Sequence, residues 1–232
     1  MVPGIEFTSR LSRGQTAAAL IWLPMHVLLL PLAAGVLYQR GVMDEVGVNV
    51  TVYVLGTLYM LLCLGRFFRR DFDALCDHPF LFLLEVIAGY GLILCGNVLI
   101  NGLMSLIGLT ENPNNEAALG LVEESFGPIA GITIFLAPIV EEGIFRAGVF
   151  GLIRRKSRLW AYLVSTLLFG LCHVWAYALY DPKELVYLLQ YIPAGIALAR
   201  CYERTDSIWG SVFLHMLNNA VSILAVTAAG GL

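Results

Sequence analysis

The sequence contains few charged residues. Asp, Glu, Lys and Arg make up 13% of its 232 residues, against about 25% in soluble domains. Hydrophobic residues make up 59%, where soluble domains have about 45–50%. These values exclude a soluble globular protein. They indicate an integral, multi-pass membrane protein with an all-α fold: a polytopic bundle of transmembrane helices in which residues 1–232 form a single membrane domain.

The sequence also lacks the local motifs of several enzyme classes. Its five cysteines form no CxxC pair, so free thiols are expected. No HExxH is present, and no local spacing therefore requires a metal ion. The chain has neither a serine-centred GxSG nor a membrane GxGD, which argues against the serine and aspartyl types of intramembrane protease. The lipid bilayer is an expected partner, whereas nucleic acid is not.

Seven long apolar segments are present. A helix needs about 20 apolar residues to cross a bilayer, and the third segment, with nearly thirty, is long enough to divide into two. We therefore expect seven to eight spans. The segments cover approximately residues 17–38, 50–66, 80–108, 128–153, 159–180, 184–200 and 207–229.

Basic residues predict the orientation of these spans. With the N-terminus in the cytoplasm, eleven Lys and Arg residues fall in cytoplasmic segments and only Arg40 and Lys183 on the opposite side. Cytoplasmic segments are enriched in Lys and Arg, so a cytoplasmic N-terminus is predicted. Arginine outnumbers lysine by twelve to two, which is typical of GC-rich prokaryotes and indicates a prokaryotic cytoplasmic membrane. Residues 116–126, in an acidic outer loop, are expected to form a short interfacial helix.

A charged cluster lies in the middle of the fourth apolar segment. Glu141, Glu142 and Arg146 stand there among residues that are almost all hydrophobic. Each such residue costs about 2.5–3.5 kcal/mol of insertion free energy at the centre of a membrane helix. Ionisable residues in this position usually mark functional sites. Glu142 and Arg146 are four residues apart and are predicted to form an ion pair, whereas Glu141, turned about 100° away, is left to face neighbouring helices.

Two later segments carry polar residues at a similar depth. At a rise of 1.5 Å per residue, Glu141 lies roughly 17 Å from the cytoplasmic end of its span, His173 about 20 Å, His215 about 12 Å and Asn219 about 18 Å. In a hydrocarbon core about 30 Å thick, these depths fall within about a third of the membrane around its midplane. Phe169 and His173 are four residues apart, as are His215 and Asn219, so each pair shares a helix face. We expect the three helices to bring these residues together.

The three motifs resemble those of a known family. Glu141-Glu142-x-x-x-Arg146, Phe169-x-x-x-His173 and His215-x-x-x-Asn219 are similar to the motifs of the CAAX-processing and bacteriocin-processing (CPBP, or ABI) intramembrane proteases. The CAAX prenyl endopeptidase belongs to the same family. The resemblance covers about residues 128–225, which it identifies as the motif-bearing catalytic core. Residues 1–127 show no matching motif and are interpreted as accessory spans. Family members often have eight spans.

The resemblance implies an endopeptidase that hydrolyses a peptide bond of a membrane-tethered protein or peptide. Glu141 and His173 match the residues that activate water. His215 and Asn219 match those that stabilise the oxyanion. Supporting positions of the motifs are matched by Glu142, Arg146 and Phe169.

The resemblance leaves two versions of the chemistry open. Family members have also been described as metalloproteases, and Glu141, His173 and His215 would make a three-ligand zinc site with an open position for water. The preferred interpretation is a glutamate mechanism without a cofactor.

Two other classes of function also fit intramembrane charges. A proton-coupled transporter places such groups at the midplane, but inverted repeats would be expected and none is visible. A non-catalytic scaffold or immunity protein would tolerate the loss of Glu141 or His173, whereas an enzyme would not. Polar residues of the apolar segments that lie outside the motifs are interpreted as packing or cavity-lining groups: His26, Glu85, Asn97 and Asn101.

Overall fold

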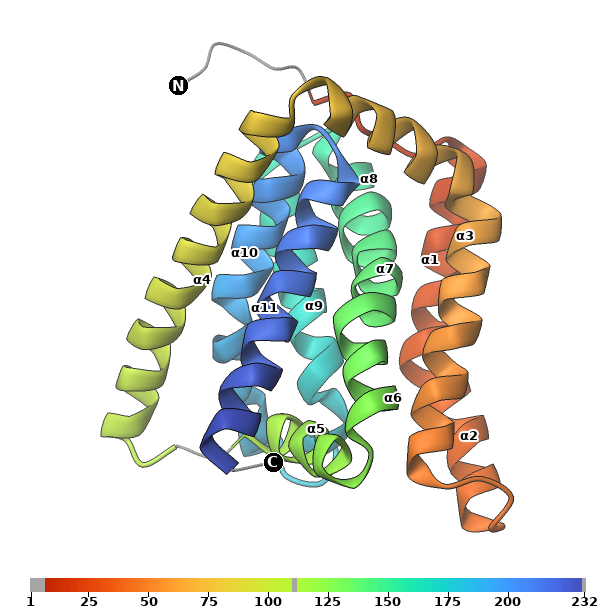
Figure 1. Ribbon diagram of the computed structural model, residues 1–232, viewed down its shortest axis with the longest axis vertical. Coiled ribbons are helices and arrows are strands. Elements are labelled where there is room, and N and C mark those ends of the chain that lie inside the picture. Colours follow the sequence, from red (N-terminus) through yellow and green to blue (C-terminus); the bar gives the residue numbers. More distant parts are fainter. Residues whose placement is uncertain (1–6, 110–111, 231–232) are drawn as a thin grey trace.

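The computed structural model describes residues 7–109 and 112–230, and all regular secondary structure in these ranges is helical (Figure 1). The α-helices are interrupted by π-helices (η1, η2 and η3) and a 3-10 helix (η4). The elements in chain order are α1 (Arg13–Pro24), η1 (Met25–Leu29), α2 (Leu30–Gln39), α3 (Glu45–Asp77), α4 (Pro79–Leu106), α5 (Pro113–Glu124), α6 (Phe126–Gly131), η2 (Ile132–Leu136), α7 (Ala137–Glu142), η3 (Gly143–Phe150), α8 (Gly151–Arg154), α9 (Arg158–Ala178), η4 (Pro182–Tyr187), α10 (Leu188–Thr205) and α11 (Ile208–Gly230).

Seven helical runs in the described ranges are long and apolar enough to cross a membrane. This confirms the predicted all-α bundle of a multi-pass membrane protein. The third apolar segment does not divide, because α4 continues without interruption over 28 residues. The seven runs are Arg13–Gln39, Glu45–Asp77, Pro79–Leu106, Phe126–Arg154, Arg158–Ala178, Pro182–Thr205 and Ile208–Ala225.

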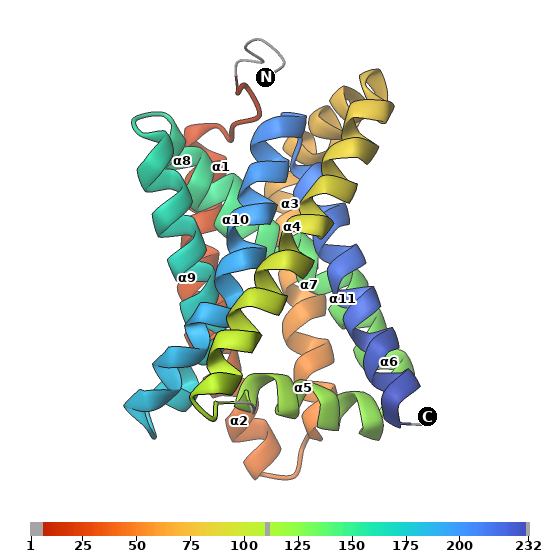
Figure 2. The ribbon, with the colours of Figure 1, turned by 90° about the vertical axis from the view of Figure 1, so that its left-hand side faces the viewer.

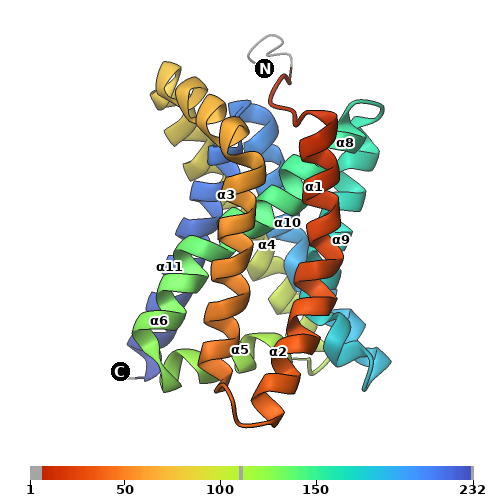
Figure 3. The ribbon, with the colours of Figure 1, turned by 90° about the vertical axis from the view of Figure 1, so that its right-hand side faces the viewer.

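Helix α3 is longer than the span predicted at residues 50–66. It contains 33 residues, which corresponds to about 50 Å at 1.5 Å per residue. Its start is fixed by Asp44, whose carboxylate accepts a hydrogen bond of 2.6 Å from the backbone N–H of Gly47. Its last turns carry charged residues and bend across the end of the bundle (Figures 1 and 3). The apolar segment at residues 50–66 is therefore shorter than the helix that contains it.

A buried carboxylate holds this end of the bundle together. Asp71 of α3 accepts hydrogen bonds from the hydroxyl of Ser9 and, at 3.0 Å, from the backbone N–H of Ile208 at the start of α11. Beside it the ring of Phe7 is buried edge-on against Tyr202, with 5.0 Å between centroids. The segment before α1 is thereby packed against α3 and α10, and the same carboxylate ties α3 to α11.

Helix α4 is attached to α10, which lies between α4 and α9 (Figure 2). Glu85 is buried and forms ion pairs with Arg200 at 2.7 Å and Arg204 at 3.0 Å. Farther along the helix, Pro193 packs where Gly96 has no side chain; a Cβ there would lie 2.5 Å from the proline Cβ. Small residues allow membrane helices to approach closely in this way. Glu85 is thus a packing group, as interpreted from the sequence.

Helix α5 lies across the other end of the bundle, roughly perpendicular to the spanning helices (Figures 1 and 2). Asn112 caps its start, and the amide of Asn112 also donates to Gln190 at 2.5 Å. The amide of Asn114 donates to the hydroxyl of Tyr191 at 3.0 Å. The short helix predicted at residues 116–126 is present, shifted by two to three residues and tied to α10.

The helical run Phe126–Arg154 carries the charged cluster between two π-helical segments. Glu141 and Glu142 are the last residues of α7, with η2 before it and η3 directly after it. Such segments occur often at functional sites. In η3 the carbonyl of Phe145 accepts a hydrogen bond of 2.9 Å from the hydroxyl of Ser165 on α9. A neighbouring helix thus satisfies a carbonyl of the irregular backbone, as membrane interiors require.

A proline explains the corresponding contact in η2. The N–H of Ala137 donates to the carbonyl of Ile132, which is the bond to the fifth preceding residue that defines a π-helix. The next carbonyl, that of Thr133, would accept from residue 138. That residue is Pro138, which has no N–H. The amide of Asn219 on α11 donates to the Thr133 carbonyl instead, at 2.9 Å.

This arrangement predicts that Pro138 and Asn219 are energetically coupled. Asn219→Ala leaves the Thr133 carbonyl without a donor, and the free energy of unfolding in detergent should fall by about 1–3 kcal/mol. In a Pro138→Ala background the loss should be smaller by about 1 kcal/mol, because the new backbone N–H can serve the same carbonyl. Ser222→Ala, on the same helix, is the matched control. Equal losses for Asn219→Ala in both backgrounds would contradict the coupling.

Candidate active site

Three helices bring a carboxylate and two imidazoles together near the middle of the bundle. Oε2 of Glu141, on α7, lies 3.9 Å from Nε2 of His173 on α9 and 3.9 Å from Nε2 of His215 on α11. Glu141 is 7% exposed and His215 5%. Residues that are 74 positions apart in the sequence thus meet at one point, as the shared membrane depth predicted.

Glu142 and Arg146 form the predicted ion pair, with 3.2 Å between Oε2 and Nε. Both side chains are completely buried. Oε1 of Glu142 also accepts a hydrogen bond of 2.9 Å from Nδ1 of His215. The sequence did not predict this second contact, through which Glu142 turns the other ring nitrogen of His215 toward Glu141.

The orientation of His173 is fixed by its own helix and by aromatic rings. Nδ1 lies 2.8 Å from the backbone carbonyl of Phe169. Because a carbonyl only accepts, Nδ1 carries the ring proton of the neutral imidazole and Nε2 is an acceptor. The ring of Tyr191 stacks on His173 with 4.5 Å between centroids. Phe169 packs on His173 at 4.8 Å, on His215 at 5.8 Å and under the guanidinium of Arg146 at 4.4 Å, so it contacts residues of all three motifs.

Asn219 lies one turn beyond His215, as the spacing predicted. Its amide donates to the Thr133 carbonyl and accepts at its oxygen from Asn218 at 3.3 Å. A side-chain amide has two N–H groups, so one remains for another acceptor. Both Asn219 and His215 line a cavity that also reaches Glu141.

Residues from the first half of the chain complete the site, and no motif pointed to them. The hydroxyl of Tyr53 on α3 donates to Oε1 of Glu141 at 3.4 Å. The ring of His26, in η1, packs edge-on against Tyr53 with 5.2 Å between centroids. The sequence signals were weak: a histidine and a tyrosine in apolar segments, each of which is more often a packing residue.

Two cavities reach Glu141 and His173. The first, of about 510 Å³, lies between η1 and α2, the start of α3 and the end of α9. The second, of about 620 Å³, is bounded by α3, α5, η2 and α11. Volumes of this size are typical of ligand sites. Oε2 of Glu141 is buried and has no hydrogen-bond partner, so a polar group in the cavity can bind it.

The side chains do not fit a metal ion as they are placed. Among the described residues, no group of three His, Cys, Asp or Glu side chains has the spacing to hold one. Zinc binds nitrogen and oxygen ligands at about 2.0–2.2 Å, usually in a tetrahedron, and donors of adjacent ligands are then closer than the 3.9 Å found here.

Comparisons with known proteins agree with the motifs. Residues 124–221 match the family model described as type II CAAX prenyl endopeptidase Rce1-like. The chain is 30% identical over 115 residues to the "Putative membrane peptidase YdiL" of Bacillus subtilis (strain 168), covering 49% of this chain and 43% of that protein. It is 23% identical over 143 residues to the "UPF0177 protein YvdC" of Lactococcus lactis subsp. lactis (strain IL1403), covering 61% and 52%.

The chain spans about half the length of the curated relatives that it matches. No solved structure matches it. The range matched by the family model nevertheless contains all three motifs, and with them Glu141, His173 and His215. Residues 124–221 of this chain are therefore similar to the Rce1-like type II CAAX prenyl endopeptidases, in agreement with the resemblance to the CPBP proteases.

Proposed function

We propose that this protein is an intramembrane endopeptidase that hydrolyses a peptide bond of a membrane-tethered protein or peptide. One observation carries the proposal: Oε2 of Glu141 and Nε2 of His173 face each other at 3.9 Å at the wall of a cavity. This distance is too long for a direct hydrogen bond. It suits a pair of groups that hold a third molecule between them.

That third molecule is a water. Nε2 of His173 is an acceptor in the neutral ring, and the carboxylate of Glu141 is also an acceptor. Two facing acceptors need a donor between them, and water has two O–H groups. Hydrogen bonds of about 2.8 Å to both atoms would subtend about 90° at the water oxygen, an acceptable angle. One of the two groups takes a proton as the oxygen attacks the peptide carbonyl, and the proton then passes to the leaving amine.

His215 and Asn219 are placed to stabilise the oxyanion that forms. Nδ1 of His215 donates to Glu142, and Nε2 donates when the ring is protonated. A carboxylate orients a catalytic imidazole in the same way in other hydrolases. Asn219 has a second amide N–H beside it. Donors in a buried cavity are worth more than in water because the surroundings screen them less.

The relatives support the coarser part of the proposal. One is named "Putative membrane peptidase", and both come from bacteria, which favours a prokaryotic cytoplasmic membrane for this chain. The excess of Lys and Arg in alternate loops favours an N-terminus on the cytoplasmic side. The glutamate mechanism is preferred to the zinc version on the chemistry of the site, since Glu141 and His173 can activate water without a metal ion.

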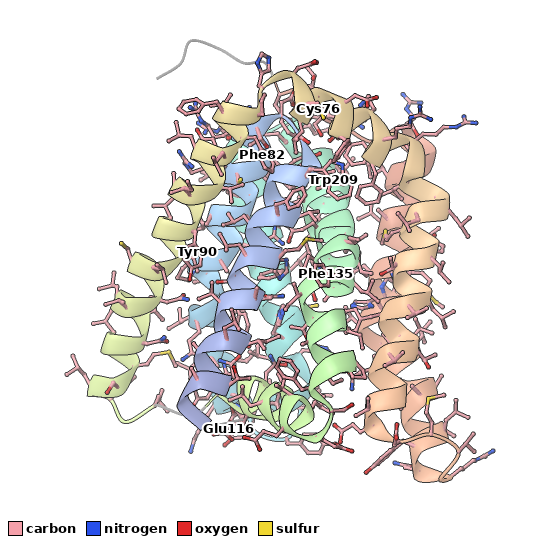
Figure 4. The ribbon with its side chains drawn as sticks, in the orientation of Figure 1. Cys76, Phe82, Tyr90, Glu116, Phe135 and Trp209 are labelled. Carbon is pink, nitrogen blue, oxygen red and sulfur yellow. The ribbon has the colours of Figure 1, made fainter. Side chains whose placement is uncertain are left out.

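The first prediction concerns the water-activating pair. Glu141→Gln and His173→Ala should each lower the rate of cleavage of a membrane-tethered reporter by about 10²–10⁴-fold in proteoliposomes, the usual contribution of a general base. Glu116→Gln changes an exposed carboxylate of α5, at the end of the bundle (Figure 4), that lines neither cavity. It is the control and should cleave at the normal rate. Full activity of either site variant would refute the proposal, and a folded wild type that cleaves no reporter would favour a scaffold or a transporter.

The second prediction separates oxyanion stabilisation from substrate binding. His215→Ala should lower kcat by about 10²–10³-fold with little change in KM, because the contact forms only in the transition state. Asn219→Ala should change kcat in the same direction. Thermal unfolding measured alongside excludes a loss of fold as the cause. A raised KM at unchanged kcat would instead assign His215 to substrate binding.

The third prediction concerns the metal. In the glutamate mechanism, activity survives exhaustive dialysis against chelators, and elemental analysis of the active protein finds less than a stoichiometric amount of zinc. If chelation abolishes cleavage and added zinc restores it, Glu141, His173 and His215 are its candidate ligands.

A further inference from the structure

The two cavities share a common wall. Residues that line both include Glu141 and His173 in the interior and Glu45, Asn49 and Tyr177 toward the end of the bundle where α5 lies. Figure 3 shows that α3 begins at this end of the bundle, where its first residue is Glu45, and a later residue of the same helix, Tyr53, contacts Glu141. A peptide that occupies either cavity along this shared wall lies beside both Glu45 and Glu141.

The charges along this path have one sign. Glu45 and Glu141 are the acidic residues that line both cavities, and no Lys or Arg of the described chain lines either. Glu45 is exposed and has no basic side chain of the described ranges within ion-pair distance. Its carboxylate is thus available to a cation that enters from outside.

Unsatisfied polar atoms in the interior also point to a bound ligand. Nδ1 of His26 lines the first cavity, is buried in a side chain that is 8% exposed, and has no hydrogen-bond partner. Oε2 of Glu141 is likewise without one. Buried polar groups without a partner are unfavourable, so a peptide backbone that enters the cavity and bonds to them is favoured.

The surrounding surface has the same sign. At this end of the bundle the described chain has two basic residues, Arg40 and Lys183, and seven acidic residues. A concentration of one charge attracts the opposite charge over about a Debye length, about 10 Å at 0.1 M salt. The acids are Asp44, Glu45, Glu116, Glu123, Glu124, Asp181 and Glu184.

We infer that the substrate is a peptide segment with a Lys or Arg near the cleaved bond, and that Glu45 recognises this basic residue. The inference rests on the proposed protease function. Glu45 precedes Tyr53, the residue that contacts Glu141, by eight positions, which is about 12 Å along a helix. An extended peptide covers about 3.3–3.6 Å per residue, so the basic residue lies about three to four residues from the cleaved bond.

The experiment uses the whole purified protein in liposomes with single-span reporters that carry a randomised segment, and mass spectrometry identifies the cleaved bonds. Cleaved reporters should be enriched in Lys or Arg about three to four residues from the cleaved bond on one side. One cleaved reporter is then made with Lys, Gln or Glu at that position, and kcat/KM is measured for each. Wild type should prefer Lys to Glu by about three- to tenfold, a typical range for a partly solvated charge pair.

Charge exchange at position 45 tests the residue itself. Glu45→Gln should bring the ratio of kcat/KM for Lys and Glu reporters close to one, and Glu45→Lys should reverse it. Glu116→Lys makes the same change of charge at the same end but outside the cavities, and should leave the ratio unchanged. In 0.5 M salt the wild-type preference should shrink, because exposed charges are screened.

The outcomes distinguish a failure of the proposed protease function from a failure of the role proposed for Glu45. If wild type cleaves no reporter, or Glu141→Gln cleaves equally well, the protease function fails. If wild type cleaves without a preference for basic residues, or keeps that preference unchanged in Glu45→Lys, the protease function stands and the role of Glu45 is refuted. A ratio that changes equally in Glu45→Lys and Glu116→Lys would assign the preference to the surface field as a whole and would also refute that role.

Discussion

The buried charge of Glu142 is the constraint on which the rest of the site depends. A fully buried carboxylate is tolerated in a membrane only when it is paired, and removal of one partner from such a pair typically costs about 3–5 kcal/mol. Arg146 neutralises it from the same helix, and His215 supplies a hydrogen bond from α11. Arg146 lies on the same helical run, so this ion pair stabilises that run. His215 lies on α11, so its hydrogen bond fixes α11 against the run. The His215 ring has its free nitrogen directed at Glu141.

The π-helical backbone of the same run, Phe126–Arg154, also holds neighbouring helices in place. Its two π-helical segments present carbonyls to two neighbours, Ser165 of α9 and Asn219 of α11. These are the helices that carry His173 and His215. The contacts that satisfy the backbone therefore also help to bring Glu141, His173 and His215 together. Pro138 has a part in this, since a residue with an N–H at that position would compete with Asn219 for the carbonyl of Thr133.

The sequence predicted the parts of the molecule that depend on local pattern or on depth. Seven spans, the ion pair of Glu142 with Arg146 and the meeting of Glu141 with two histidines follow from hydropathy, helical spacing and a rise of 1.5 Å per residue. Long-range partners were not predictable: Tyr53 contacts Glu141 from a helix 88 positions away. The full length of α3 was missed because its charged last turns leave the apolar pattern. The π-helices depend on which carbonyls find side-chain donors, and no local sequence rule gives this.

The polar contacts of Glu141 are longer, at 3.4–3.9 Å, than those of Glu142, at 2.9–3.2 Å. Among the described residues, Arg146 is the cation that lies within this cluster, and it is paired with Glu142. The polar neighbours of Glu141 are two imidazoles at 3.9 Å and a tyrosine hydroxyl at 3.4 Å. A guanidinium at 2.8 Å would stabilise the carboxylate more strongly, but it would also occupy the oxygen that binds water in the proposed mechanism. Two adjacent glutamates divide the requirements between them. Glu142 is fully buried and held by Arg146 and His215, which fixes the orientation of His215. Glu141 lies at the wall of the cavities with longer contacts, which suits the role of base that we propose for it.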